Sequence, residues 1–341
     1  MTLSLYLPID EINSNKPNPD LAADYLELTA FFSRKNEAFT KDLINASEIG
    51  AEDDYVDVED EFCNRDEIVS GASARILGRQ QALGSSYPFT LDEGGDLLLF
   101  SKRDLTLGQT AYLLCLILSH LQSVSAILNG SIVYPDADEI RQLRQYFQYF
   151  ATAGLAAEIG GQAWSFGYPR PDHSDFLDKL EKIWGVLRDG AVDPDPASPS
   201  RPKDDQIDIF AWRSHHDGLP GFLLAGAQVA TGSNWREKSI RSHLTDVFWK
   251  RWFGRQPVSQ MVCYHIIPFA RPDADFRDDV LTLGNVLHRL RLPYRVEQAV
   301  ALQDEGVQIE AFDHLSAAKE WIISYSHRAY AETATVLKRD G

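Results

Sequence analysis

Three polar residues have the types and the spacing that metal-dependent phosphodiester chemistry requires. Asp208 opens a compact β-type run in DQIDIFAW, and Gln228 lies late in a second run, FLLAGAQVA. Lys238 follows after the turn GSNW. Hydrolysis of a phosphodiester needs hard oxygen ligands that hold a divalent cation, and a positive group that stabilises the developing charge. A carboxylate on one strand, with an acceptor and a lysine beside the next strand, supplies these groups.

The end of the second run has no evident packing role. Side chains alternate along a strand, so Gln228 and Ala230 share a face. Asn234 is expected to cap a following helix, and Glu237, three residues later, to close a capping box. Lys238 would then lie in the first turn of that helix. Its flexible stem can bring the ammonium group to the end of the strand.

With these residues the chain resembles the restriction-endonuclease-like, or PD-(D/E)xK, nucleases. Their pattern is an acid on a helix, an Asp that opens one strand, and then Glu or Gln, any residue, and Lys on the next strand. Asp208 and Gln228 match this pattern, whereas Ala230 stands at the lysine position. Some members carry a lysine that has moved to the following helix, and Lys238 looks like that replacement. The segments FGYPR, KDDQIDIFAW and GSNW add to the resemblance, which covers roughly residues 150–270.

The resemblance also implies a helix acid and a metal. Glu158, in AGLAAEIGGQAW, is a lone carboxylate on an apolar helix upstream of Asp208. Asp208, Gln228 and Glu158 are therefore expected to hold Mg²⁺ or Mn²⁺, with Lys238 stabilising charge. Basic residues that follow the motif are expected to contact DNA phosphates: Arg236, Arg241 and Lys250.

Each of these residues also has a purely structural explanation. Asp208 can cap a backbone amide in a turn, and Gln228 can bond to a neighbouring strand. Lys238 can be a solvated helix lysine, and Glu158 can pair with an arginine such as Arg170. The sequence leaves both explanations open. His243 and His265 could act as general bases, but nothing in the sequence places a nucleophile beside them.

The elements that would position these residues indicate an α/β fold. Residues 1–135 are expected to be mainly helical, with a short hairpin around Gly94 and Gly95. Residues 136–341 are expected to form the second domain, with the order helix, helix, strand, strand, helix, strand, helix. That order predicts a small mixed sheet flanked by helices. The resemblance implies that this sheet is a restriction-endonuclease-like core.

Composition restricts the class of protein. The chain has 341 residues, 44% of them hydrophobic, and a formal net charge of −17. Acid is concentrated early, in GAEDDYVDVEDEFCNRDE, and base follows the motif, so the net charge weakens a DNA hypothesis without excluding it. Three scattered cysteines and an N-terminus without a signal-peptide pattern predict a cytoplasmic protein. No stretch is long enough to predict a membrane span.

The resemblance therefore implies a metal-dependent DNA endonuclease in bacterial defence against phage or foreign DNA. Since no ATPase motif is present, a separate ATPase, helicase or sensor protein is an expected partner. The acidic N-terminal half would bind that partner, form a homodimer contact or mask the basic groove. Two alternatives stay open. One is a catalytically silent nuclease-like subunit that binds DNA or protein, as Ala230 suggests, and the other is an RNA nuclease.

Overall fold

The computed structural model describes most of the chain, namely residues 18–43, 58–121, 134–200, 202–271 and 273–339. The N-terminal stretch examined for a signal peptide, and the first part of the acidic stretch, lie outside these residues. Within the described ranges, no helix combines the length and the apolar character needed to cross a membrane.

The chain divides into two compact units. The first comprises residues 1–141 and 317–341, and the second is Gln142–Ser316. The sequence placed a boundary after residue 135, close to the first division. It placed the C-terminal segment in the second domain, whereas this segment groups with the first unit from Ala317 onward.

The first unit combines helices with a small antiparallel sheet of order β1-β3-β2. Its elements are α1 (Pro19–Phe32), β1 (Glu37–Phe39), α3 (Val58–Leu83), η1 (Gly84–Ser86), β2 (Phe89–Leu91), β3 (Leu97–Phe100) and α4 (Leu107–Ser119). The predicted hairpin is confirmed, with Gly95 at a φ of 75° in its turn. The helical spacing of LAADYLELTAFFSRKNEAFTKDLI predicts one long helix, but α1 ends at Phe32 and the chain turns at Asn36, whose φ is 58°.

A buried polar network lies in the core of the first unit. The Glu27 carboxylate is fully buried and accepts hydrogen bonds from Arg79 Nη1 at 2.8 Å, Tyr87 Oη at 2.6 Å and Tyr112 Oη at 2.7 Å. Arg79 Nη1 also lies 2.6 Å from Asp24 Oδ1. Because the guanidinium group is only 1% exposed, these carboxylates compensate a charge that water does not reach.

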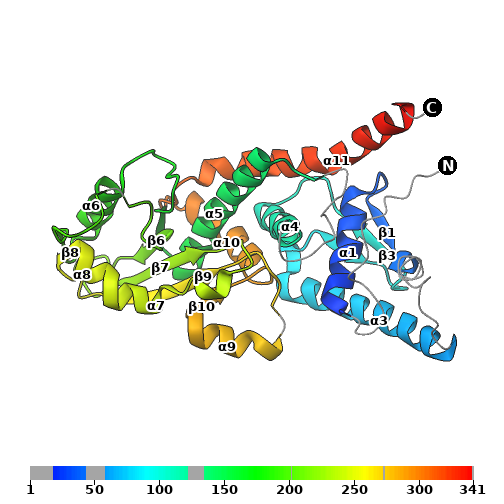
Figure 1. The fold of residues 1–341 in the computed structure, drawn as a ribbon, viewed down its shortest axis with the longest axis horizontal. Helices are drawn as coiled ribbons and strands as arrows, with labels where there is room; N and C mark the ends of the chain where they lie inside the picture. Colours follow the sequence, from blue (N-terminus) through cyan, green and yellow to red (C-terminus); the bar gives the residue numbers. More distant parts are fainter. Residues whose placement is uncertain (1–17, 44–57, 122–133, 201, 272, 340–341) are drawn as a thin grey trace. The chain divides into compact units, whose positions relative to one another are not determined.

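The second unit is built on a five-stranded mixed sheet of order β10-β9-β7-β6-β4 (Figure 1). Its strands are β4 (Gln162–Ser165), β6 (Ile209–Arg213), β7 (Leu223–Val229), β9 (Met261–Ile266) and β10 (Asn285–Leu287). Its other elements are α5 (Ala137–Ile159), which begins in the first unit, α6 (Phe176–Leu187), η2 (Trp235–Glu237), α7 (Ile240–His243), the π-helical turn η3 (Leu244–Phe248), α8 (Trp249–Trp252), α9 (Asp273–Leu283), α10 (Leu292–Asp304), η4 (Phe312–His314), and a small pair of β5 (Ala191–Val192) and β8 (Phe253–Arg255). The last helix, α11 (Leu315–Arg339), begins in this unit and belongs to the first unit from Ala317 onward. The expected α/β class, with a small mixed sheet flanked by helices, is confirmed at this level.

Strand directions determine what meets at each edge of this sheet. β7, β9 and β10 are parallel, so their carboxyl ends lie at one edge. β6 is antiparallel to β7, and its first residues therefore lie at that same edge. The start of β6 and the end of β7 are brought together in this way.

Helices cover both sheet faces because successive residues of β6 and β7 point to opposite faces and are apolar on each. Phe210, Trp212 and Leu224 pack in one aromatic-rich cluster with residues of α6, η3 and α8. On the other face lies α5, which packs closely on α10: a side chain added at Gly154 would collide with Leu292.

Two strands of the five-stranded sheet, β4 and β10, were not predicted from the sequence. β4 follows α5 after Gly160, whose φ is 67°, and at Gly161 a side chain would collide with the backbone of β6. The helical spacing of DDVLTLGNVLHRLRL predicts one continuous helix, but the helix ends at Leu283, and after Gly284, whose φ is 91°, the chain continues as β10.

The connection between β6 and β7 lies at the opposite edge of the sheet. Its residues from Arg213 to Gly221 are exposed, including the two histidines of the turn HHDGLPG. Gly221 N donates to Ser259 Oγ at 2.9 Å, which ties the end of the turn to the segment before β9.

Candidate functional site

Asp208 is fixed at the sheet edge by its backbone and its side chain. Its N–H donates to Ala227 O at 2.8 Å, and its carbonyl accepts from Phe166 N at 2.6 Å and Gly167 N at 2.9 Å. Its Oδ2 atom accepts from Val229 N at 2.7 Å and from the Gln228 side-chain amide. The carboxylate therefore points toward the end of β7, as the sequence predicted.

Gln228 lies in a row of polar side chains across the strands. It pairs with His265 of β9, and Asp208, one residue before β6, continues the register opposite Gln228. Directly opposed residues lie on the same sheet face. The Gln228 Nε2 atom also lies 3.5 Å from Val229 O, so this amide nitrogen stands between two oxygen atoms.

The residue of α5 that reaches this site is Gln148, which the sequence analysis missed. Its Nε2 atom donates to Ser165 Oγ at 2.6 Å. A Cβ atom added to Gly167 would lie 2.5 Å from Asp208 Oδ1 and 2.7 Å from Gln148 Nε2. Gly167 therefore leaves the space in which these two side chains approach each other. The only sequence signal was a glutamine in the aromatic run QYFQYF.

Glu158 lies apart from this group. Its Oε2 atom is 2.5 Å from Arg295 Nε, and its Oε1 atom accepts a hydrogen bond from Tyr264 Oη at 3.4 Å. It follows Gln148 by ten residues on α5, which corresponds to about 15 Å of helix. The expectation that Glu158 joins Asp208 and Gln228 is therefore not met, because the helix presents Gln148 there. Arg170, the arginine suggested as a partner for Glu158, instead donates to Ser174 O and Lys203 O.

Burial controls the protonation of Asp208. It raises the pKa of this carboxyl to about 7, and the nearby Asp204 carboxylate adds to the rise. The Val229 N–H and the Lys238 ammonium oppose it. A carboxyl group that changes charge near neutral pH within a polar cluster is typical of a functional site.

Lys238 reaches the site by a different route from the one predicted. Asn234 makes no side-chain cap, and residues 235–237 form only the short turn η2. Ser239 caps α7, which begins at Ile240, so the expected capping box is wrong and Lys238 precedes the helix. Its ammonium nevertheless lies close enough to influence the pKa of both Asp208 and His265. Within the part of the chain that the structure describes, no ion pair or side-chain hydrogen bond engages Lys238.

His265 adds a buried imidazole to the row. It is 0% exposed, and among the described residues neither ring nitrogen has a hydrogen-bond partner of normal geometry. Burial lowers its pKa to about 4; the Trp235 backbone opposes this change and the Lys238 charge reinforces it. The His265 ring is therefore neutral at neutral pH, and it lies beside Gln228 on the sheet and near the Lys238 ammonium.

The loop before Asp208 is held in place by Asp205. Its Oδ1 atom lies 2.8 Å from Arg251 Nη1 and 3.3 Å from His243 Nε2, and its Oδ2 atom accepts from Trp252 Nε1 at 2.6 Å. Burial raises the pKa of Asp205, but these bonds and the Arg251 charge outweigh burial and hold it below its usual value. These contacts with α7 and α8 therefore fix the loop and, with it, the position of Asp208.

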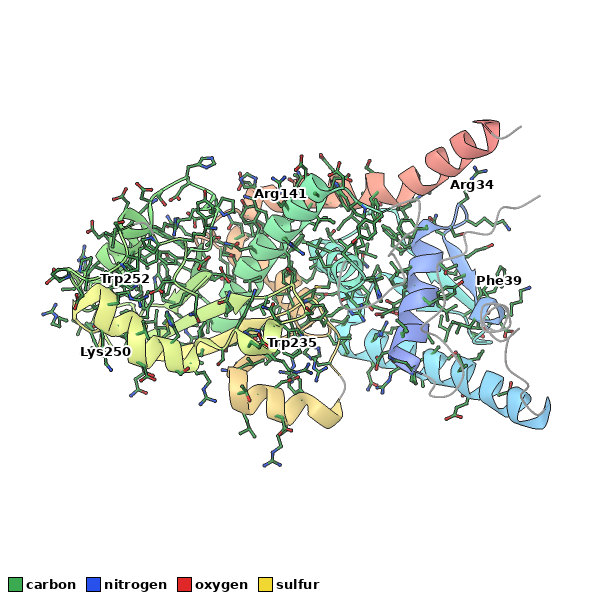
Figure 2. All side chains as sticks on the ribbon, viewed as in Figure 1. Arg34, Phe39, Arg141, Trp235, Lys250 and Trp252 are labelled. Carbon is green, nitrogen blue, oxygen red and sulfur yellow. The ribbon has the colours of Figure 1, made fainter. Side chains whose placement is uncertain are left out.

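The three predicted phosphate contacts have different environments. Arg236 lies two residues from Lys238 and is half exposed. Arg241 donates through Nη1 to Leu281 O. Lys250 is exposed on α8, and Figure 2 shows it far along the segment from Trp235. The ten residues from Ile240 to Lys250 correspond to about 15 Å of helix.

The donor set for a metal is small. Among the described residues, no three His, Cys, Asp or Glu side chains lie close enough together to hold a metal ion. The oxygens at the edge come from Asp208, Val229 and, after rotation of its amide, Gln228. Comparison with family models, with curated proteins and with solved structures gives no match to this chain.

Proposed function

We propose that the chain is a divalent-metal-dependent DNA endonuclease whose reaction centre is the sheet edge formed by Asp208, Gln228 and Lys238. The convergence of these three residues carries the proposal. Two come from strand ends and one from the following turn, yet they meet around one buried carboxyl group. Their types match the restriction-endonuclease-like pattern, including its displaced lysine.

Mg²⁺ or Mn²⁺ would be held by Asp208, the Gln228 amide oxygen and the Val229 carbonyl. The amide nitrogen of Gln228 now stands between Asp208 Oδ2 and Val229 O, as a cation would. Turning this amide would present its oxygen instead. Because Mg²⁺ keeps several waters and often uses only one or two carboxylates, this set is sufficient. A bound metal would polarise the phosphate and lower the pKa of water.

The remaining roles belong to side chains of the chain itself. Lys238 would stabilise negative charge on the attacked phosphate, because its ammonium has no competing partner among the described residues. Gln148 would orient Asp208 and water from α5. His265 is neutral and buried, so it would not take a proton from Lys238. The Lys238 ammonium would therefore keep its positive charge near Asp208.

A silent DNA-binding or protein-interaction subunit is the second candidate. Two observations favour it: the Gln228 amide donates to Asp208, and Ala230, which stands at the lysine position, is fully buried against Trp235 and Phe269. In that case the polar edge would be a structural remnant. Metal-dependent cleavage separates the two candidates.

Cleavage of supercoiled plasmid by the purified full chain with Mg²⁺, Mn²⁺ or EDTA is the test. We expect metal-dependent cutting that falls about 10²–10³-fold in Lys238→Ala, since such losses follow removal of one charge-stabilising donor. Asp208→Asn should also abolish a metal-dependent shift in thermal unfolding. Duplex binding without cutting by any metal would favour the silent subunit. Preference for an RNA of the same sequence would identify an RNA nuclease.

A further inference from the structure

Arg236 is held in a preformed orientation beside the proposed reaction centre. Its Nε atom lies 3.0 Å from Asp279 Oδ1, and its guanidinium stacks over the Trp235 ring at 4.3 Å. Arg271 lies on the other oxygen of Asp279, with its Nε 2.6 Å from Oδ2, and 5.4 Å from the same ring. The Asp279 carboxylate is only 4% exposed, whereas the Arg236 side chain is 52% exposed. The anchor is buried and the cation is presented to solvent.

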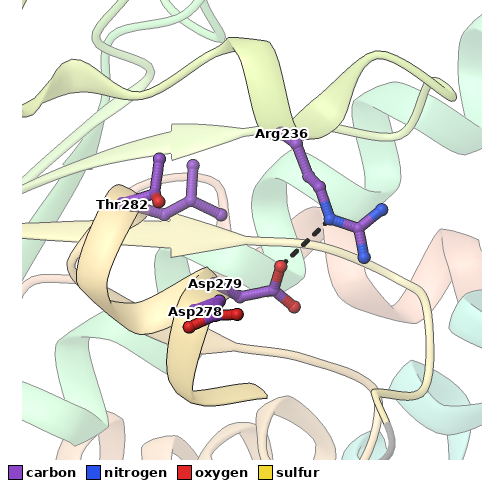
Figure 3. Close-up of a pocket in the computed structure, with 5 residues that line it drawn as sticks. Arg236, Asp278, Asp279 and Thr282 are labelled. Atoms are coloured by element: carbon purple, nitrogen blue, oxygen red, sulfur yellow. Dashed lines mark hydrogen bonds and ion pairs between the residues drawn. The ribbon is translucent and has the colours of Figure 1, made fainter. Parts of the chain in front are cut away.

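The direction of the guanidinium determines what it can bind. The bonds described for Arg236 use Nε, and Figure 3 shows its two terminal nitrogens pointing away from Asp279. The hollow on the Asp279 side, about 280 Å³, is lined by Arg236, Asp278, Asp279, Thr282 and Leu283. Its carboxylates would repel a phosphate. An anion must therefore approach the terminal nitrogens from outside the hollow.

The local charge favours an anion at this end of the sheet, although the chain as a whole is acidic. His288, just after β10, has a pKa lowered to about 3 by burial and then by the positive charges of Arg291, Arg289 and Arg271, with Asp279 opposing them. Arg271, Arg289 and Arg291 thus lie near this position, whereas Asp278 and Asp279 lie on the α9 side. A phosphodiester strand that crosses the carboxyl ends of β7, β9 and β10 and keeps clear of α9 would approach these guanidinium groups.

We propose that Arg236 binds a DNA phosphate next to the one at Lys238, and that Asp279 is the positioning residue that orients Arg236 for this contact. The proposal rests on the DNA endonuclease function above and specifies the path of its substrate. The strand passes over η2 on the side of Arg236 that faces away from α9. Lys250, far along α8, does not contribute.

The test is equilibrium binding of a fluorescein-labelled DNA duplex to the full chain in EDTA, over a range of NaCl concentrations. Arg236→Ala is expected to weaken binding about tenfold and to reduce the slope of log K against log salt by about 0.9, the value for one phosphate contact. Lys250→Ala is the matched control and is expected to keep both values. An unchanged slope in Arg236→Ala, or an equal change in Lys250→Ala, overturns the proposal.

Asp279→Asn separates positioning from simple electrostatics. Removing a negative charge should strengthen DNA binding if Asp279 only opposes the phosphate. We expect weaker binding in Asp279→Asn, and little further loss when it is added to Arg236→Ala. Tighter binding, or full additivity, would contradict the positioning role. If the wild-type chain neither binds nor cuts DNA, the proposed function fails as well, whereas normal cutting with an unaffected Arg236→Ala defeats only the present proposal.

Discussion

Replacing Asp208 with asparagine should stabilise the second unit at neutral pH. The native carboxyl is buried, and its pKa is raised from an ordinary value of 3.8 to about 7. Between these two values the folded chain holds a proton that the unfolded chain has released. The free energy of unfolding must therefore fall as pH rises through this range. Asparagine keeps the shape and can still accept from Val229 N, but it does not titrate.

The size of the effect follows from the two pKa values. Their difference corresponds to about 4 kcal/mol, at 1.36 kcal/mol per pKa unit. This is an upper limit, since water that enters the site stabilises the ionised carboxylate. Asp208→Asn should match the wild type near pH 4 and gain between about 2 and 4 kcal/mol above pH 7.

Urea unfolding at several pH values, followed by tryptophan fluorescence, measures this difference. Six of the seven tryptophans lie in the second unit, so the signal reports mainly on it. Asp205→Asn is the control from the same loop. Because bonds hold the pKa of Asp205 below its usual value, that variant should be destabilised at neutral pH, and the loss should shrink as pH falls. An Asp208→Asn difference that does not depend on pH would refute the reasoning.

Three further outcomes are expected from substitutions in both units. Gly167→Ala should cost about 1–3 kcal/mol by overpacking and abolish plasmid cutting, because its Cβ would displace Asp208 and Gln148. Gly185→Ala, at an open position of α6, should leave cutting unchanged and raise stability by at most about 1 kcal/mol, because alanine is the better helix former. Glu158→Gln should leave the cleavage rate unchanged and cost at most about 1 kcal/mol in a urea titration, since its ion pair is partly exposed. Arg79→Met should lower stability by about 3–5 kcal/mol in thermal unfolding, because buried carboxylates lose their cation; a smaller loss would mean that the Arg79 network is hydrated.

Local patterns in the sequence predicted the strands that carry the candidate site. β6 and β7 are compact apolar runs with a polar residue at one end. This pattern can be recognised in each segment by itself, without knowing which other segments pack against it. The pattern was enough to predict that Asp208 and Gln228 lie close together, because antiparallel pairing of consecutive strands places the start of one beside the end of the other. By contrast, Gly284 with its positive φ ends α9 and leads into β10, where helical spacing had dominated the prediction. The end of α5 at Gly160 was predicted, but the short strand β4 after it was not.

Residues that reach the site through tertiary packing were not predictable in this way. Gln148 and Glu158 lie on the same helix, and only the packing of α5 on β4 decides which one meets Asp208. A carboxylate is the expected ligand, so chemical type favoured Glu158 and geometry favoured Gln148. Similarly, His265 gains its place in the polar row from the parallel register of β7 and β9, which no local pattern encodes.

The exposed turn between β6 and β7 offers a place to attach a reporter. It joins the two strands at the edge opposite the polar row. The seven residues of β7 separate this turn from the polar row by about 23 Å. Loop tips of this kind tolerate inserted sequence. A fluorophore or a tether placed at Asp217 or Gly218 would therefore report on single molecules of the chain without contacting the polar row at the opposite edge.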